Sequence, residues 1–381
     1  MKRLFYSMSV AAALLSAACS DDNDYSNVGD AREQILEAAA TDFVDRTVIP
    51  TYKGLADETI SLTEACEAMQ EAFARGELTT ALVKTACDHW IASRKYWELS
   101  EAFLYGAAGD YNIDPHIDSW PLNHTELQAL LDDPVRMGKM DDEYAGTYLG
   151  YGLLGFHALE YMLFENAAPR QLDKYTAEEL IYVVAVAGDL RNQCVRLEAA
   201  WAGMDNISDI KQEILEQAEL EPSFDYGESM RAAGRAGSKY KTYLEVAQEI
   251  LQGSIDIADE VANQKIGRPA NGSSSDDKNY IESPYSHNSQ IDFIDNIRSI
   301  RNAYLGSNAG DASVSDYISD VAPDVDAKVR EAIEDAIAAI GQAEAPFVNN
   351  ATSAKWKQSV EVVNDLVDAL EEAQQALLII K

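Results

Sequence analysis

One apolar segment of the chain contains an imidazole and a carboxylate. Within residues 145–164, only His157 and Glu160 can ionise apart from tyrosines. They are three positions apart, so on a helix they lie on the same side, and such a pair is a common source of two ligands for a transition metal. Burying an unpaired charge is costly, so each group needs a partner. The alternative is a structural pair, in which His157 is hydrogen-bonded to Glu160 or to another core group.

Four glycines in the same segment favour a built site over a structural pair. Gly146, Gly150, Gly152 and Gly155 each destabilise a helix by about 1 kcal/mol relative to alanine. Glycine is tolerated where another backbone has to approach closely. The segment is apolar on every face, which predicts a helix that is buried on every face. The glycines and the ionisable pair exclude a transmembrane helix.

Further ligands are expected on another predicted helix, over residues 80–105. Trp90, Arg94, Trp97 and Glu101 follow spacings of four, three and four, so they share one face. Glu101 is our first choice for a third metal ligand, and Arg94 could hold or neutralise it. An ordinary salt bridge of Glu101 is the alternative.

The loop that follows this helix supplies a weaker candidate ligand, Asp118. The loop is rich in Gly, Asp and Pro, but it also carries Trp120.

Helical periodicity dominates the whole chain. Apolar residues recur at intervals of three and four, and strand-like alternation is nowhere sustained. We therefore predict an all-α fold of long, packed helices, with a kink at Pro50. Long proline-free runs support this prediction: 51–114, 135–168, 170–221, 223–268 and 285–322.

The N-terminus resembles a bacterial lipoprotein signal. Lys2 and Arg3 precede an apolar stretch that is too short to span a bilayer, and small residues then lead to Cys19. We expect residues 1–18 to be a signal peptide, Cys19 to be lipidated, and 19–30 to be an acidic tether. The acidic residues after Cys19 resemble the tag that directs some Gram-negative lipoproteins to the outer cell surface. An ordinary cleaved secretory peptide is the alternative, and both place the mature protein outside the cytoplasm.

The cysteines are compatible with an oxidising compartment. Cys66 and Cys87 lie about equally far on either side of a break near Gly76, so a helical hairpin would place them at the same height and a disulfide is plausible. Cys194 would remain, buried as a small hydrophobe. There is no CxxC pair and no Cys/His zinc spacing.

The charge of the chain excludes two classes of partner. There are 65 acidic and 30 basic residues, which gives a formal charge of −35. Nucleic-acid binding requires a basic surface, as does adsorption to anionic lipids. Any attachment to a membrane would therefore be through the lipid anchor only. The acidic surplus is compatible with cationic partners, and its simplest explanation is solubility.

Gly155-Phe156-His157-Ala158-Leu159-Glu160 resembles the GxHxxE signature of imelysin-like proteins. The resemblance covers most of residues 31–381. Other matching segments are Val48-Ile49-Pro50-x-Tyr52, Trp90-x-x-x-Arg94, Ser100-Glu101-Ala102-Phe103, Ile117-Asp118-Ser119-Trp120-Pro121, and Ile257 to Val261 with Lys265-Ile266.

The resemblance implies a two-part helical fold with the GxHxxE helix buried near the junction of its halves. We expect an N-terminal half over 31–170, which carries the site, and a C-terminal half over 171–381. A weak sequence similarity between the segments 94–106 and 298–306 also suggests related halves. The resemblance further implies a cell-envelope protein associated with iron uptake, in a family that has also carried a metallopeptidase label.

Three functions remain open at this point. The preferred one is a surface-exposed outer-membrane lipoprotein that captures a divalent or ferric metal, iron first, or a metal-loaded ligand. It would use His157, Glu160 and Glu101, supported by Gly155, Arg94, Asp118 and Trp120, and would serve outer-membrane uptake machinery. The second is a metal-dependent peptidase acting on extracellular polypeptides. The third is a helical adaptor without metal.

The sequence speaks against one form of peptidase. None of the five histidines is followed by Glu, so the zincin motif His-Glu-x-x-His is absent. A hydrolase would also need an open metal position and a separate general base, and the residues do not demand either.

Overall fold

The computed structural model describes residues 22–379, with side chains from residue 31 onward. Over this range helices form most of the chain, and the strands are limited to one short antiparallel pair, β1 (Phe164–Glu165) and β2 (Ala168–Pro169). The all-α prediction is therefore confirmed. The predicted signal peptide, 1–18, and the predicted lipidation site Cys19 lie outside the described residues.

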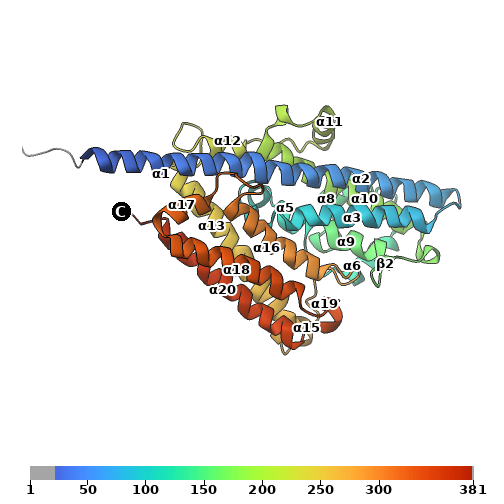
Figure 1. Cartoon of the computed structure of the whole chain (residues 1–381). Coiled ribbons are helices and arrows are strands. Elements are labelled where there is room, and N and C mark those ends of the chain that lie inside the picture. The colour runs from blue at the N-terminus through green and yellow to red at the C-terminus, as the bar shows by residue number, and fades with distance from the viewer. Residues whose placement is uncertain (1–21, 380–381) are drawn as a thin grey trace, which may run out of the picture.

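The first three elements form one continuous rod along the molecule (Figure 1). They are α1 (Asp22–Asp42), the π-helical turn η1 (Phe43–Val48) and α2 (Ile49–Ala74). The segment predicted as a tether is thus helical from Asp22 on. Pro50 lies in the first turn of α2, where its missing backbone N–H is tolerated. The helix is irregular just before α2, in the π-helical turn η1, and the kink at Pro50 stays a prediction.

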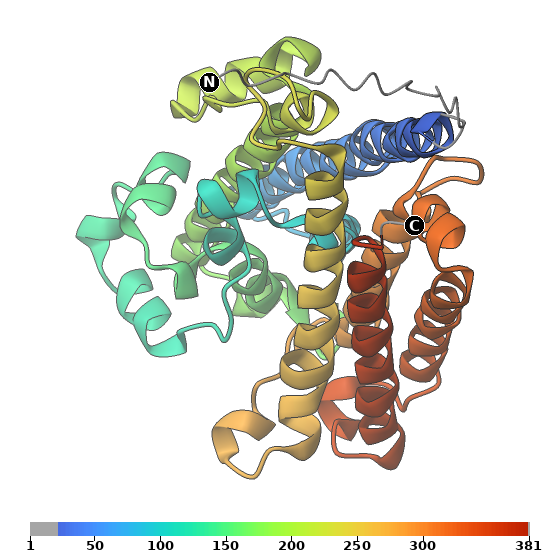
Figure 2. The ribbon, with the colours of Figure 1, turned by 90° about the vertical axis from the view of Figure 1, so that its left-hand side faces the viewer.

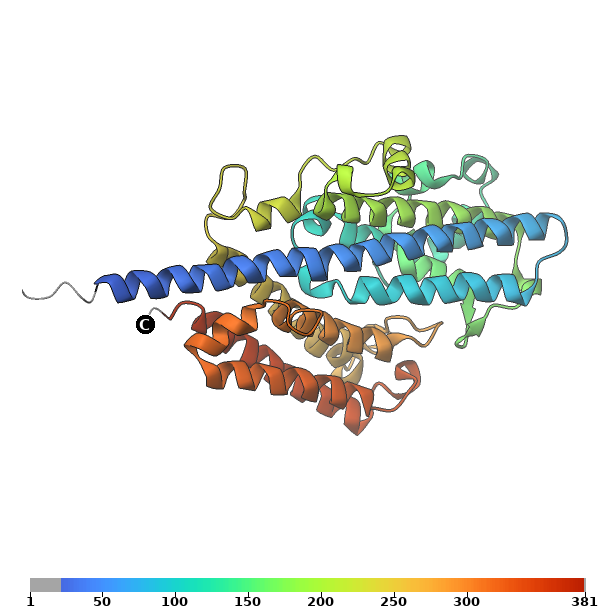
Figure 3. The same cartoon turned by 45° about the horizontal axis from the view of Figure 1, so that its top comes forward.

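The rod connects two helical bundles (Figure 3). In the first bundle, α2, α3 (Thr80–Glu98) and α10 (Ala177–Ala202) pack along one another, and α9 (Gly155–Leu163) packs against α3 and α10. Polar caps start these helices: the Thr79 side chain accepts from the N–H of Leu82, and Thr176 forms a capping box with Glu179.

The second bundle consists of four long helices of the C-terminal part. They are α13 (Tyr243–Glu260), α16 (Ser289–Leu305), α18 (Pro323–Gly341) and α20 (Ala354–Ala376). Figure 2 shows α13 and α20 side by side, and α16 and α18 complete the bundle. The α1 part of the rod packs against this bundle through α13 and the short helix α17 (Val314–Val321).

The boundary predicted at residue 170 does not match this packing. Helix α10 follows that boundary, but it packs along α2 and α3 in the first bundle. The predicted boundary followed the signature segment along the chain, whereas a bundle is closed by whichever helix covers its exposed apolar face. The division into two halves at this residue stays a prediction.

The apolar segment that we predicted as one helix is broken twice. It contains α8 (Asp142–Tyr148), the 3₁₀ turn η3 (Tyr151–Leu153) and α9, with extended backbone at Leu149 and Leu154. The prediction of a continuous helix was wrong because its glycines permit such breaks. The burial prediction is confirmed for α9, of whose nine residues all but Tyr161 are buried.

Short elements connect the long helices. Among the described residues, no helix is long and apolar enough to cross a bilayer. The remaining elements are η2 (Glu101–Phe103), α4 (Ala107–Asp110), α5 (Ile113–Ile117), α6 (His124–Leu131), α7 (Pro134–Met137), η4 (Leu172–Lys174), η5 (Met204–Asn206), α11 (Asp209–Ala218), α12 (Tyr226–Arg231), η6 (Val261–Ile266), α14 (Gly267–Asn271), α15 (Ser275–Lys278) and α19 (Phe347–Asn350).

Candidate metal centre

A glycine places the signature helix against the loop that carries Asp118. Gly155, the first residue of α9, has a φ of +70°, which favours glycine. A Cβ atom at this position would overlap the carbonyl group of Ile117, the last residue of α5. The absence of a side chain at Gly155 therefore brings His157 close to Asp118, the residue after Ile117.

His157 lies between two carboxylates. Its Nε2 atom is 3.1 Å from Asp118 Oδ1, and its Nδ1 atom is 3.6 Å from Glu160 Oε2. The ring is 3% exposed. Burial alone would lower the pKa of His157, but the carboxylates of Asp118 and Glu160 raise it to about 9.

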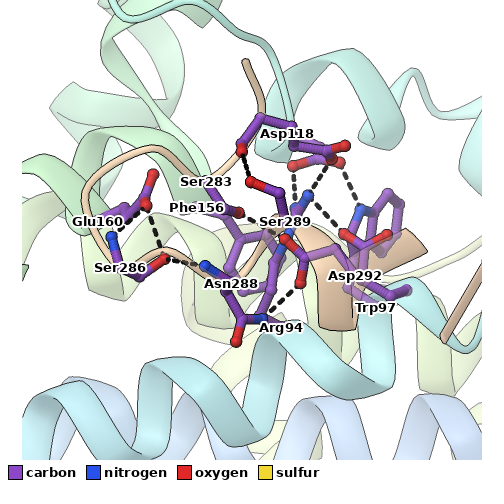
Figure 4. Close-up of polar contacts among 12 residues, drawn as sticks. Arg94, Trp97, Asp118, Phe156, Glu160, Ser283, Ser286, Asn288, Ser289 and Asp292 are labelled. Carbon is purple, nitrogen blue, oxygen red and sulfur yellow. Dashed lines mark hydrogen bonds and ion pairs between the residues drawn. The ribbon is translucent and has the colours of Figure 1, made fainter. Parts of the chain in front are cut away.

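Glu160 is fixed by a loop from the other bundle (Figure 4). Its Oε1 atom accepts from the backbone N–H of Tyr285 at 2.9 Å and from both the N–H and the hydroxyl of Ser286 at 2.7 Å. Its Oε2 atom is buried and has no hydrogen-bond partner. Because Glu160 faces Nδ1 of His157, it is placed to orient the ring and leave Nε2 for another partner.

Arg94 is the central cation of the site (Figure 4). Its guanidinium group is fully buried and forms ion pairs with Asp118, Glu98 and Glu282. A fourth carboxylate, Asp292, is 3.9 Å away. Arg94 was expected to neutralise Glu101, but it neutralises these other carboxylates instead.

Glu101 lies beyond this group, next to a second buried cation. Helix α3 ends at Glu98, so Glu101 belongs to the turn η2 rather than to the face that carries Arg94. Its carboxylate is 3.5 Å from the Nζ atom of Lys265, which also lies 3.6 Å from Glu98 and 3.3 Å from Glu282. The salt bridge considered as the alternative for Glu101 is therefore present.

Aromatic side chains enclose the site. The indole N–H of Trp97 donates to Asp118 Oδ2 at 2.8 Å. The Trp120 ring lies between His157 and Tyr280, at centroid distances of 5.7 and 5.2 Å. A cavity of about 260 Å³ adjoins the site and is lined by Trp120, Tyr280, Asp118, Glu101 and Lys265 among others. This cavity provides a route from solvent to the cluster.

Two sets of ligand atoms converge closely enough to hold a metal ion among the described residues. Asp118, His157 and Glu282 form one set, and Glu98, Glu101 and Asp118 form the other. The first set fits a transition metal better because it contains an imidazole. In addition, Glu282 Oε2 is buried without a hydrogen-bond partner, and His157 Nε2 forms no hydrogen bond although Asp118 Oδ1 lies 3.1 Å away. Buried polar atoms of this kind are costly unless something binds them.

The charge of the cluster also favours a cation. Six buried carboxylates face only two side chains with a fixed positive charge, Arg94 and Lys265. Burial raises the pKa of Glu282 to about 7 and raises the pKa values of Glu101 and Asp292 well above their usual range. Without a metal, protons therefore offset part of the surplus. The carboxylates are Glu98, Glu101, Asp118, Glu160, Glu282 and Asp292.

The structure brings most of the residues predicted from sequence into one site. His157, Glu160, Asp118, Arg94 and Trp120 lie together, held by Gly155. Sequence reasoning overlooked four charged residues as members of the site. Glu98 could have been found, since it is four positions after Arg94 on one helix face. The others approach from the second bundle without a local signal: Lys265, Glu282 and Asp292.

The disulfide expected between Cys66 and Cys87 is not formed. Both are buried free thiols, as is Cys194. The Sγ atom of Cys87 instead donates to the carbonyl oxygen of Leu163 at 3.4 Å. Equal height in a hairpin brings two cysteines near each other but does not orient their Cβ–Sγ bonds.

Comparison with known proteins identifies the family. The model of the Imelysin family, Peptidase_M75, matches residues 48–377. The chain belongs to the imelysin family. It is 28% identical over 282 residues to iron-regulated protein A of Synechococcus elongatus, covering 74% of this chain and 68% of that protein. The family predicted from sequence is therefore confirmed.

Solved structures of imelysin-like proteins share the fold. A crystal structure described as an iron-regulated protein A precursor from Parabacteroides distasonis is 27% identical, with a TM-score of 0.77 over 91% of this chain and 95% of that one. An imelysin-like protein from Psychrobacter arcticum is 14% identical, with a TM-score of 0.56 over 90% and 93% of the two chains. The second similarity concerns the fold alone.

Proposed function

We propose that this protein binds a transition-metal cation, with iron as the first candidate, at His157, Asp118 and Glu282. The observation that carries the proposal is the convergence of three buried side chains, two of which present ligand atoms without a hydrogen-bond partner. In this arrangement Glu160 orients the imidazole through Nδ1. Glu101 is then a partner of Lys265 rather than a ligand.

The biological role that we propose is metal capture at the cell envelope. Two relatives are named as iron-regulated proteins, which supports iron as cargo. The lipoprotein-like N-terminus would anchor the chain at the outer membrane, and delivery would be to uptake machinery there. A metal-loaded ligand could also enter, since the adjoining cavity of about 260 Å³ exceeds the size of a bare ion.

Metal binding to the purified protein tests this function. We expect one equivalent of Fe²⁺ or Mn²⁺ by anaerobic titration calorimetry and elemental analysis, and loss of this equivalent in His157→Ala and Asp118→Asn. His89→Ala is the matched control, because His89 also faces a carboxylate, Glu58 at 2.9 Å, but outside the site.

Two outcomes would contradict the proposal. If no metal binds to the folded wild-type protein, the His157–Glu160 pair is structural and the adaptor interpretation holds. If a bound metal is unaffected in folded His157→Ala, the metal lies elsewhere. Cleavage of polypeptides that is lost in His157→Ala together with the metal would instead support the peptidase.

A further inference from the structure

A second cavity lies between α8, α10 and α11, and it shares no lining residue with the metal centre. Its volume is about 240 Å³. Helices α8 and α10 approach closely here because each presents a glycine to the other: Gly146 of α8 lies against α10, and Gly188 of α10 lies against α8. A Cβ atom at Gly146 would overlap Asp189, and one at Gly188 would overlap Asp142. The close approach holds Asp189 of α10 under α8 at the edge of the cavity.

Two buried polar side chains from one face of α10 line this cavity. Asp189 and Gln193 are one turn apart and are 3% and 7% exposed. Asp189 Oδ2 is 2.8 Å from His116 Nε2, whereas Oδ1 has no protein partner. The Gln193 amide has no hydrogen-bond partner among the described residues. The side chain is largely buried while its amide borders the cavity, so the amide is free to bind a ligand there.

The charges around the cavity select a cation. Four carboxylates line it, and Arg191 is the single cation in its lining. Arg191 already donates to the Asp142 carboxylate at 2.9 Å and to the side-chain oxygen of Asn192 at 2.8 Å. Over the described range, the carboxylates that converge tightly enough for a metal ion belong to the metal centre and not to this cavity. The carboxylates here are Asp141, Asp142, Glu143 and Asp189.

One wall of the cavity is apolar. Ile214, Ala218 and Leu220, from α11 and the residues after it, face the polar side chains of α10. A cavity of about 150 Å³ admits benzene, so one of about 240 Å³ can hold an aliphatic chain of a few carbon atoms. An inorganic cation would make no apolar contact with this wall.

We propose that this cavity binds a small aliphatic amine. The ammonium group donates to Asp189 Oδ1 and to the Gln193 carbonyl oxygen, which are the two acceptors without partners. The alkyl chain lies along Ile214, Ala218 and Leu220, and a second amine at its far end faces the carboxylates at the rim. The site is independent of the proposed metal centre and of its function.

Calorimetric titration of the purified protein with 1,4-diaminobutane tests the proposal. The probe is compared with 1,4-butanediol, which has the same length but no charge, at about 0.15 M salt so that long-range attraction to the acidic surface is screened. We expect saturable 1:1 binding of the diamine and at least about tenfold weaker binding of the diol, as expected for charge-assisted hydrogen bonds.

Variants separate the site from general attraction of cations to an acidic protein. Gln193→Leu keeps the charge and the approximate volume and should weaken diamine binding about tenfold. Ala218→Phe should fill the cavity and abolish diamine binding. It replaces Gln193→Leu as the test variant if Gln193→Leu does not fold. Gln358→Leu, an exposed position on α20, should bind as the wild type does.

The proposal fails if the wild type shows no saturable binding of the diamine. It also fails if the diol binds equally well, or if folded Gln193→Leu and Ala218→Phe both retain wild-type affinity for the diamine.

Discussion

Gly155 and Ile117 are packed so closely that no side chain fits between the start of α9 and the end of α5. This contact sets the position of both sides of the candidate metal centre, because His157 follows two residues after Gly155 and Asp118 directly follows Ile117. The glycine of the signature is thus required for the distance of 3.1 Å between His157 and Asp118.

Replacement of Gly155 by alanine should disrupt the site. The new Cβ atom would require a strained positive φ and would overlap the Ile117 carbonyl. We expect a loss of stability on the order of 3 kcal/mol, measured by urea denaturation, together with loss of metal binding. Gly150→Ala is the control from the same segment, because a Cβ there meets nothing within 4 Å. Equal stability of the two variants would contradict this role of Gly155.

The third metal ligand is Glu282 in the proposal based on the structure and Glu101 in the prediction from sequence. Glu282→Gln should lower metal affinity by at least about tenfold, because a neutral amide replaces a charged ligand. Glu101→Gln should retain the metal stoichiometry, since Glu101 faces Lys265. Titration calorimetry on both variants decides the matter. If Glu101→Gln loses the metal and Glu282→Gln retains it, the ligand set predicted from sequence is the correct one.

The sequence predicted the local half of the site better than its distant half. His157 and Glu160 could be found because only two ionisable groups of this kind occur in an apolar segment, and Arg94 because it shares a helix face with two tryptophans. Lys265 and Glu282 lie more than 100 residues away and reach the site only when the second bundle packs against the first. In the sequence, Lys265 and Glu282 look like ordinary charged residues of a helix surface.

The structure differs from the sequence pattern at Glu101 and at residue 170 for a common reason. In both places a local pattern ends where tertiary packing takes over. The helical stripe of α3 stops at Glu98, which moves Glu101 into a 3₁₀ turn. The chain likewise continues past residue 170 into α10 without leaving the first bundle. All-α architecture follows from periodicity alone, whereas the termini of helices and the choice of packing partners do not.

Metal affinity should increase with pH. The pKa of His157 is raised to about 9, so near neutral pH a proton occupies the imidazole and has to leave before a metal binds. Burial also raises the pKa of Glu282 to about 7, which adds a second competing proton below that pH. Mn²⁺ affinity should rise about tenfold per pH unit from 7 to 8 and more steeply from 6 to 7. An affinity that is constant over this range would contradict proton competition at His157.

The buried thiols should be inert in the folded protein. Burial raises the pKa of Cys87 to about 12 and also raises the pKa values of Cys66 and Cys194, so very little nucleophilic thiolate is present. In a soluble form that begins at Ser20, we expect no rapid reaction with Ellman's reagent in buffer and three thiols in urea without reductant. A count of one thiol in urea would instead support a disulfide between Cys66 and Cys87.

Trp120 should control the rate at which metal reaches the site rather than its affinity. Its ring lies against His157 and lines the cavity through which solvent approaches, but it donates no ligand atom. Trp120→Ala should therefore speed both association and dissociation of Mn²⁺, by a similar factor, in stopped-flow experiments, and leave the equilibrium affinity within about threefold. Trp120→Phe keeps an aromatic ring in place and serves as the control. A change confined to the dissociation rate would show instead that Trp120 stabilises the bound state directly.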